Sequence, residues 1–367
     1  MTMKVNDRAE ERRVFVGLSG GVDSAVTAAL LRDSGAAVTG VFIQGWYPPG
    51  LPCSWAADRR DAMRVAAHLG IPFVTLDASA EYKAGVIDYL IREYRAGRTP
   101  NPDVMCNREV KFGAFHRFAK EHGADAIATG HYARTEGGRL FRGIDDGKDQ
   151  SYFLWAVPKE ALADTVLPLG GMHKAEVRKL AEKYRLPNAA KKDSQGICFL
   201  GSISVEDFLR AELAPEEGKT LDGVGNEIGS HGGAVLYTLG ERIVLEGSAS
   251  GPWYVVAKDL AANTVTVAHE ISSGGARHSL KLTEMNWLGS DDGESAGKVG
   301  GGVGEGVVGE EAEREVEAQY RYHGPRIKGA MRGDSFIPAE PLAEPVASGQ
   351  SLVSYQGNEC VGGGIIT

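Results

Sequence analysis

The feature that most constrains the fold is an alternation of strand-like and helix-like segments across the first 200 residues. Apolar runs that read as strands occur at residues 14–18, 37–43, 73–77 and 126–130. Apolar residues recur at helical spacing in residues 23–32, 58–69, 86–94 and 112–122. Such alternation is typical of a parallel sheet covered on both faces. We therefore expect an α/β fold with a doubly wound parallel sheet, which binds ligands beyond the carboxyl ends of its strands.

The pattern changes after about residue 201, where short alternating runs replace the helical periodicity. Residues 253–256 and 264–268 alternate as half-buried strands do. Because a chain of 367 residues exceeds a usual single core, several domains are expected. We predict a catalytic domain at residues 1–205, a small β-rich central domain at 206–275 and a third domain at 276–367. Residues 291–309 are rich in glycine without a regular apolar period, and we interpret them as a surface loop.

Charge and cysteine usage exclude several classes of protein. A net charge of −9 argues against a protein that coats nucleic acid nonspecifically, although it leaves room for a local basic groove. No apolar run approaches the length of a membrane helix and residues 1–13 lack a signal-peptide core, so we expect a cytoplasmic protein without a membrane partner. Its four cysteines form no zinc-binding spacing, so no metal-ligating residue is assigned.

A short Gly-Ser turn joins the first expected strand to the first expected helix. It reads Ser19, Gly20, Gly21, Val22, Asp23, Ser24. Glycines let the backbone approach a ligand closely, and the start of a helix offers unpaired N–H groups to an anion. The turn has neither the Lys-Ser/Thr pair of a Walker loop nor the spacing of a dinucleotide fingerprint. With two hydroxyls in this context, a phosphate site is favoured over a plain turn.

Two further blocks place a cysteine beside basic residues. In the first, Pro100 and Pro102 stiffen a loop in which Asp103 lies three residues before Cys106. Arg98, Arg108 and Lys111 flank this cysteine in the sequence, and cations lower a thiol pKa. In the second block, Cys198 follows Lys191 and Lys192 in a glycine-containing turn. A lone cysteine is more often a buried hydrophobe, and the spacing does not show whether these two thiols meet.

These blocks together resemble a known family. The Gly-Ser turn is similar to the pyrophosphate-binding loop (PP-loop) of the ATP pyrophosphatases, which split ATP into AMP and pyrophosphate. Five ordered blocks resemble the bacterial tRNA-specific 2-thiouridylases, at residues 19–24, 101–107, 129–134, 148–154 and 193–199. The tail at residues 349–364 resembles the end of that family's C-terminal β-barrel.

The resemblance implies ATP-dependent 2-thiolation of the wobble uridine of tRNA, with Mg²⁺ on the ATP phosphates. The implied ATP-binding residues are Gly17, Leu18, Ser19, Gly20, Gly21, Val22, Asp23, Ser24, Ile43 and Gly130. Cys198 is expected to carry a persulfide from a separate sulfur-donor protein, Cys106 to release the sulfur and form a disulfide with Cys198, and Asp103 to act as general acid/base. The implied tRNA contacts are Asn101, Pro102, Asp103, Lys148, Asp149, Gln150, Arg321 and Tyr322.

Departures from the family pattern leave alternatives open. Gln44-Gly45-Trp46 stands where the family often has Lys-Asn before the tryptophan, and residues 240–245 depart from its Gly-Gln-Arg run. His131 is interpreted as a structural histidine.

Two alternative functions remain open. Another PP-loop pyrophosphatase, such as an amidating synthetase, would make neither cysteine important. A non-catalytic adenylate- or RNA-binding protein would bind ATP without forming AMP.

Overall fold

The computed structural model describes residues 12–48, 55–192, 204–245, 252–271, 277–289, 313–342 and 344–367. Contacts divide the chain into two compact units. The first comprises Met1–Arg92 and Asn101–Ala214, and the second comprises Glu93–Pro100 and Pro215–Thr367. Cys53 and Cys198 lie outside the described residues. No helix in the described ranges is long and apolar enough to cross a membrane.

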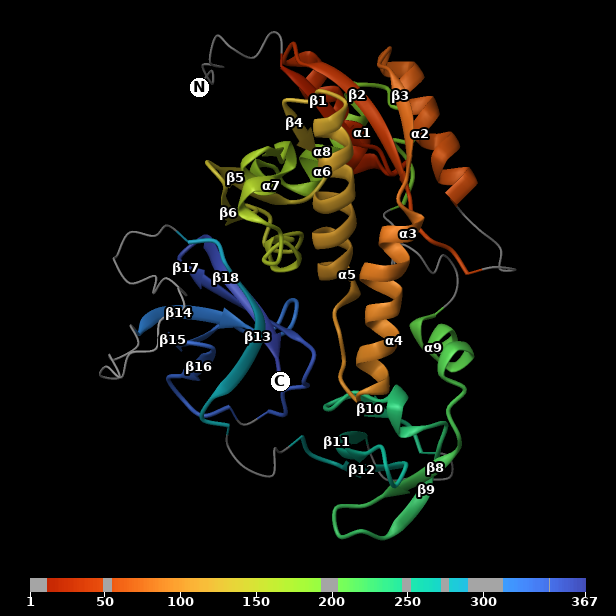
Figure 1. Ribbon diagram of the computed structural model, residues 1–367, viewed down its shortest axis with the longest axis vertical. Coiled ribbons are helices and arrows are strands. Elements are labelled where there is room, and N and C mark those ends of the chain that lie inside the picture. The colour runs from red at the N-terminus through yellow and green to blue at the C-terminus, as the bar shows by residue number, and fades with distance from the viewer. Residues whose placement is uncertain are drawn as a thin grey trace, which may run out of the picture. The chain divides into compact units, whose positions relative to one another are not determined.

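The first unit is built on a five-stranded parallel sheet (Figure 1). Its strand order is β3-β2-β1-β4-β7. The strands are β1 (Arg13–Gly17), β2 (Ala37–Gln44), β3 (Phe73–Asp77), β4 (Ala126–Ala128) and β7 (Thr165–Val166). Because the order reverses between β1 and β4, the topological switch point lies where these two strands end. The expected parallel sheet is confirmed, and the Gly-Ser turn follows one of the two strands at its switch point.

Helices cover both faces of this sheet because β1 alternates its side chains. Val14 and Val16 are buried in a core that includes residues of α1 (Val22–Asp33), α2 (Trp55–Leu69) and α8 (Lys174–Lys183). On the other face, Phe15 stacks against Phe118 of α6, with ring centroids 6.4 Å apart. Alternate residues of a strand point to opposite faces, so the side chains of β1 pack against helices on both faces of the sheet.

Two helical stretches follow one another in the chain, at residues 79–95 and 102–121 (Figure 1). The second contains Asp103 and Cys106, so the prediction of a loop around these residues is wrong from Pro102 onward. We nevertheless call residues 101–106 the cysteine loop. The successive elements of the two stretches are α3 (Ser79–Tyr82), the π-helix η1 (Lys83–Ile87), α4 (Asp88–Arg95), α5 (Pro102–Met105), the π-helix η2 (Cys106–Ala114) and α6 (Phe115–Glu121). A Cβ atom at Gly85 would lie 2.6 Å from Glu109 Cγ, so glycine permits η1 and η2 to pack closely. π-Helical turns are rare and often occur at functional sites.

Shorter elements complete the first unit. They are the hairpin β5 (Ala133–Glu136) and β6 (Arg139–Arg142), the 3₁₀ turns η3 (Ser151–Phe153) and η4 (Pro168–Gly171), and the helices α7 (Lys159–Ala163) and α9 (Val205–Leu213).

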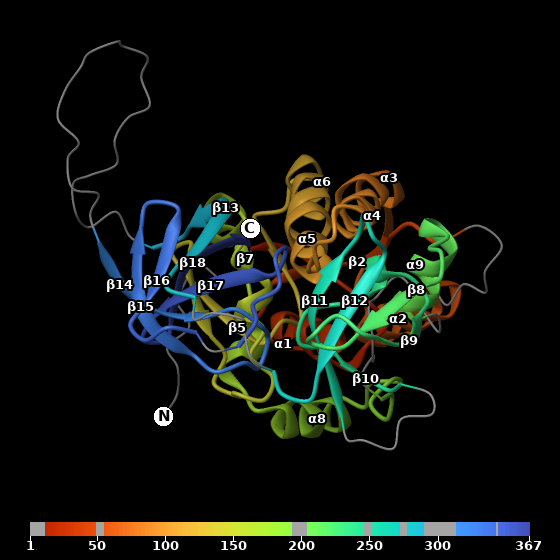
Figure 2. The same cartoon turned by 90° about the horizontal axis from the view of Figure 1, so that it is seen from below.

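The second unit contains a central sheet with strand order β10-β11-β12-β8-β9 (Figure 2). Its elements are β8 (Gly218–Leu221), β9 (Glu227–His231), the 3₁₀ turn η5 (Ala234–Leu236), β10 (Arg242–Ile243), β11 (Trp253–Asp259) and β12 (Thr264–Ala268). Its core includes Val255, Val265 and Val267, which are fully buried. These are alternate residues of the two runs that the sequence predicted as half-buried strands.

The same unit ends in a closed six-stranded barrel. Its strands are β13 (Leu280–Trp287), β14 (Arg314–Gln319), β15 (Ile327–Arg332), β16 (Ser335–Pro338), β17 (Ser351–Gln356) and β18 (Glu359–Ile366). β13 pairs with both β16 and β18, which closes the ring and leaves these two strands no free edge. Phe336, Leu352 and Ile366 fill the interior. The expected C-terminal β-barrel is confirmed.

Candidate active site

The Gly-Ser turn forms an anion-binding shape at the start of α1. Gly21 is the N-cap in extended conformation, and no side chain caps the helix. The hydroxyls of Ser19 and Ser24 lie 3.2 Å apart, and Ser24 Oγ donates to the Gly21 carbonyl over 3.1 Å. The turn is thus held by its own serines while the first N–H groups of α1 lack a capping side chain, which is the arrangement that binds phosphate.

Two glycines allow the backbone to close around this turn. Gly20 has a φ of +80°, and a Cβ atom there would lie 2.4 Å from the Asp58 carbonyl oxygen. A Cβ atom at Gly130 would lie 2.9 Å from the Asp23 carbonyl carbon and from Ser24 N. Gly130, two residues after the end of β4, therefore packs directly on the first turn of α1, and the structure brings these two predicted ATP-site segments together.

The remaining predicted ATP-site residues separate into two kinds. A Cβ atom at Gly17 would lie 3.8 Å from Ile43 Cδ1, so the ends of β1 and β2 are adjacent there. Leu18 and Val22, in contrast, are buried in the apolar core. Only the backbone of Leu18 and Val22 is therefore available to a ligand, whereas Ile43 is only partly buried.

An ion pair that the sequence did not reveal lies at the turn. Lys174 Nζ contacts both carboxylate oxygens of Asp23, at 2.7 and 2.8 Å, and Tyr132 Oη donates to the same carboxylate over 2.9 Å. Lys174 is the first residue of α8, and its side chain is only 15% exposed. The partners are 151 residues apart, so no local spacing could have predicted the pair.

A second cation reaches the far side of the turn. Lys191 Nζ lies 2.9 Å from Asp58 and 2.8 Å from Asp61, both on α2. Burial acts to lower the pKa of Lys191, but hydrogen bonds with these two carboxylates outweigh it and raise that pKa. Nearby, Asn188 Nδ2 donates to the Gly20 carbonyl over 3.0 Å. The segment that leads toward Cys198 is thus anchored beside the turn as far as it is described.

The cysteine loop begins at a capped helix start. Asn101 Oδ1 accepts a hydrogen bond from Val104 N, and Pro102 occupies the first turn of α5, as its preset φ favours. Cys106 is a buried thiol at the start of η2. Burial raises the pKa of Asp103, and the positive charge of Lys111 opposes that rise. The loop therefore holds a thiol and a carboxyl group whose proton is retained to higher pH than usual.

Lys111 links this loop to the nucleotide turn. Burial, with a further contribution from Lys111, holds the pKa of His131 well below its ordinary value. His131 Nδ1 lies 2.7 Å from Thr129 Oγ1, and its ring stacks near Phe112. His131 also follows Gly130, which packs on α1. The charge of Lys111 thus affects both Asp103 and His131, and the contact between the rings of Phe112 and His131 brings η2, which begins at Cys106, beside the segment of Gly130.

The basic surroundings expected for Cys106 are only partly present. Arg98 forms a bidentate ion pair with Glu93, and both residues belong to the second unit. Arg108 Nε pairs with Glu109 over 2.7 Å. Sequence proximity therefore overstated the cationic environment, because two of the three cations are already paired with carboxylates. Cys198 lies outside the described residues, so the expected Cys106–Cys198 disulfide is not shown.

The predicted tRNA-contact segment at residues 148–150 is held by internal bonds. Asp149 is buried and accepts hydrogen bonds from Arg142 Nε, Gly143 N and both donors of Ser151. Gln150 Oε1 accepts from Tyr132 N over 3.0 Å. The side chain of Lys148 is only partly buried. Asp149 therefore stabilises the conformation of residues 148–150 through internal hydrogen bonds.

The other predicted contact, Arg321 and Tyr322, lies in the second unit just after β14. Arg321 is exposed and pairs with Glu344 over 2.9 Å. The rings of Tyr322 and His323 have centroids 3.9 Å apart. An exposed arginine next to stacked rings offers both a phosphate partner and a stacking surface.

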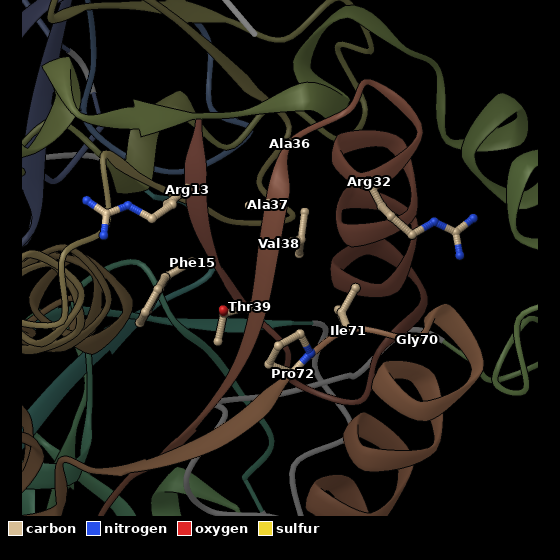
Figure 3. A pocket seen from close by; sticks show the side chains of 10 residues that line it. All are labelled: Arg13, Phe15, Arg32, Ala36, Ala37, Val38, Thr39, Gly70, Ile71 and Pro72. Carbon is tan, nitrogen blue, oxygen red and sulfur yellow. The ribbon is translucent and has the colours of Figure 1, made fainter. Parts of the chain in front are cut away.

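A pocket of about 410 Å³ lies elsewhere (Figure 3). Its lining includes Arg13 and Ala37, the first residues of β1 and β2, together with Pro72. It is therefore at the amino ends of the strands, opposite the edge at which the PP-loop lies. Ligands of doubly wound sheets bind at the carboxyl edge, so this pocket is not assigned to the nucleotide.

Comparison with known proteins gives the family. Residues 12–202 match the model described as tRNA methyl transferase HUP domain, residues 206–269 a tRNA methyl transferase PRC-barrel domain, and residues 277–366 an aminomethyltransferase beta-barrel domain. The tRNA-specific 2-thiouridylase MnmA of Shouchella clausii is 39% identical over 98% of this chain and 97% of its own length. The chain belongs to the tRNA-specific 2-thiouridylase family. The MnmA protein of Streptococcus pyogenes is 40% identical over 96% of this chain and 94% of its own.

Similarity to solved structures is weaker. The U34-tRNA thiolase NcsA from Methanococcus maripaludis matches with a TM-score of 0.36 and 19% identity, covering 57% of this chain and 66% of its own. A TM-score this low supports no argument about function. The family assignment of this 2-thiouridylase therefore rests on its nearly full-length sequence relatives.

Proposed function

We propose that this 2-thiouridylase uses ATP to replace the C2 oxygen of the tRNA wobble uridine by sulfur. The observation that carries the proposal is the packing of Gly130 on the start of α1, together with the ring contact between the next residue, His131, and Phe112 of η2, the helix that begins at Cys106. A phosphate site, a titratable carboxyl and a thiol are thereby gathered in one unit. That set of groups suits activation by ATP followed by sulfur transfer.

The PP-loop would hold the ATP phosphates through backbone N–H groups of residues 19–24 and the two serine hydroxyls. Gly20 and Gly130 fit this role because a side chain at either position would clash with the neighbouring backbone. Lys174, now paired with Asp23, is placed to neutralise phosphate charge. Mg²⁺ would bind to the phosphate oxygens, because it is a hard cation that prefers oxygen ligands.

The chemistry has two stages. The uridine C2 oxygen takes the AMP moiety of ATP and pyrophosphate leaves, which makes C2 electrophilic. The terminal sulfur of a Cys198 persulfide, supplied by a donor protein, then attacks C2 and AMP departs. Cys106 attacks the inner sulfur of Cys198, which frees the thiolated base and leaves a Cys106–Cys198 disulfide that a thiol reductant reopens. Asp103 would move the protons.

We assign tRNA contacts to the loop Asn101–Asp103, to residues 148–150 and to Arg321 with Tyr322. Within residues 148–150, Lys148 and Gln150 would face the RNA and Asp149 would support them, because its oxygens already accept internal hydrogen bonds. A wobble base would need to leave its stack to reach the cysteine loop.

The deciding experiment replaces each thiol. Cys106→Ser and Cys198→Ser should each lower tRNA 2-thiolation, measured by mass spectrometry of nucleosides with ATP and a persulfide donor, by at least about 10²-fold, since serine cannot take part in sulfur exchange. Cys360→Ser is the matched control, because Cys360 is also a buried thiol but lies on β18 of the barrel. Full activity of either of the first two variants would reject the assigned roles.

An amidating synthetase on the same PP-loop is the second candidate. It would release pyrophosphate with an amide donor and a small substrate, without tRNA, and would tolerate both cysteine substitutions. The matched family models carry the words methyl transferase, but a phosphate-binding turn and a buried thiol in the same unit suit adenylation and sulfur transfer better. Pyrophosphate release that depends on tRNA separates thiolation from the synthetase reaction.

A further inference from the structure

A short segment, Glu93–Pro100, runs from the end of α4 to the cysteine loop and belongs to the second unit. We name it the strap. At its start, Gly97 ends the helix with a φ of +74°, and its N–H donates to the Tyr94 carbonyl over 2.8 Å. The guanidinium of Arg98 closes the turn on Glu93, whose side chain is only 8% exposed. The strap is thus held by an ion pair of its own, in which the carboxylate is buried.

The central sheet module holds one side of the strap. A Cβ atom at Gly97 would lie 2.7 Å from Leu260 Cδ1, so the backbone of Gly97 packs directly against the Leu260 side chain. Thr99 Oγ1 lies 3.2 Å from Thr238 Oγ1. Burial, with the nearby charge of Glu241, raises the pKa of Tyr94 to about 12, so this phenol stays neutral at physiological pH.

The barrel holds the other side through three consecutive residues. Thr99 N donates to the Ser348 carbonyl over 2.8 Å, and Gln350 Nε2 donates to the Thr99 carbonyl over 2.7 Å. Between them, Gly349 has a φ of +90°, and a Cβ atom there would lie 2.9 Å from Thr99 N. Gly349 N donates in turn to Ile366 of β18 over 2.7 Å. Both polar backbone groups of Thr99 are therefore bound by the barrel.

The chain that follows Thr99 is unusually stiff. Pro100 and Pro102 have ring-fixed φ angles, and Thr99 and Asn101, each preceding a proline, are confined to extended conformations. Asn101 has φ −109° and ψ 96° and caps α5 directly. Few backbone torsions thus remain between the carbonyl held by Gln350 and the helical turn that carries Asp103 and Cys106.

From these contacts we infer that Gln350 is a positioning residue for the cysteine loop: by holding the Thr99 carbonyl, the barrel sets the placement of Asp103 and Cys106. The barrel then contributes to the rate of the chemical steps as well as to tRNA binding. The inference rests on the roles proposed above for Asp103 and Cys106.

The test uses Gln350→Ala and Gln350→Glu in the full-length enzyme. The first variant removes the side-chain donor, and the second keeps its size but presents a carboxylate that repels the Thr99 carbonyl. Gln356→Ala and Gln356→Glu are the controls, because Gln356 Nε2 also donates to a backbone carbonyl of the barrel, that of Glu315, at an exposed site. Single-turnover thiolation at saturating tRNA, tRNA affinity and amide hydrogen exchange of residues 101–111 are measured for all four.

Loss of one hydrogen bond that fixes a loop should slow single turnover by about tenfold or more and speed exchange in residues 101–111, with Gln350→Glu affected most. The Gln356 variants should match the parent enzyme. Unchanged exchange, or a loss confined to tRNA affinity, would overturn the inference and leave the roles of Asp103 and Cys106 standing. Faster exchange at an unchanged single-turnover rate would instead overturn the roles proposed for those two residues, and with them the inference.

Discussion

At the scale of single residues, the partners of a side chain decide its chemistry more than its sequence neighbours do. Arg98 and Arg108 flank Cys106 in the chain, yet each is neutralised by a glutamate. Lys111 instead acts on Asp103 and His131. Of the three cations near Cys106 in the sequence, Lys111 is therefore the one that affects the pKa values of Asp103 and His131.

Asp103 yields a prediction with a defined sign. Burial raises its pKa, so the folded state binds a proton more tightly than the unfolded state does. Its contribution to the free energy of unfolding is present at low pH and is lost as pH rises from about 4 through the raised pKa. We expect Asp103→Asn to be more stable than the parent at pH 7.5, while thiolation falls by about 10²-fold or more.

Urea denaturation between pH 4 and 8 checks this expectation. Asp77→Asn is the control of opposite sign, because hydrogen bonds from Ser79 lower the pKa of Asp77. That carboxylate stabilises the fold above its unfolded pKa, and its contribution is lost as pH falls. A free energy of unfolding that is lower for Asp103→Asn than for the parent at pH 7.5 would contradict the assigned burial effect.

At the scale of elements, the turn between β1 and α1 shows how two neighbouring glycines differ. Gly20 is in the left-handed region and faces the Asp58 carbonyl, where a Cβ atom would be only 2.4 Å away. At Gly21 a Cβ atom would meet Ser19 Oγ at 3.3 Å, and its φ of −83° is open to any residue. The fold therefore requires glycine at residue 20 but not at residue 21.

Alanine substitutions separate the two cases. We expect Gly20→Ala to lower the free energy of unfolding by about 1–3 kcal/mol, because strain and a backbone clash combine there. Gly21→Ala should cost less than about 1 kcal/mol. Chemical denaturation measures both, and ATP binding should weaken in each since either methyl group crowds the phosphate site. Equal destabilisation by the two substitutions would show that the backbone of the turn differs from that described.

At the scale of the whole molecule, the chain forms two units with separate cores. The described contacts of the PP-loop lie within the first unit, whereas the closed barrel and the central sheet lie in the second. A ligand that binds only the folded first unit stabilises that unit by mass action. We therefore expect two thermal transitions, only one of which responds to ATP.

Calorimetry with a non-hydrolysable ATP analogue tests this. At an analogue concentration of 100 times its Kd, the first unit should gain about 2.7 kcal/mol and the other transition should stay in place. Lys174→Met should weaken analogue binding by about tenfold or more, because a charged hydrogen bond near the phosphates is lost. Lys179→Met, an exposed position on the same helix, should behave as the parent. A single transition that shifts as a whole would contradict the independence of the units.

Local sequence patterns were enough to predict the strands and helices of the first unit and a phosphate site. The period of apolar residues fixed the strands and helices around the sheet because burial of one face is a local property. The Gly-Ser turn predicted a phosphate site because its conformation depends largely on its own residues. The ion pair of Lys174 with Asp23 and the hydrogen bond of Gln350 to the strap had no such signal. They depend on which distant segments the packed sheet and barrel bring within a few ångströms, and that follows only from the folded chain.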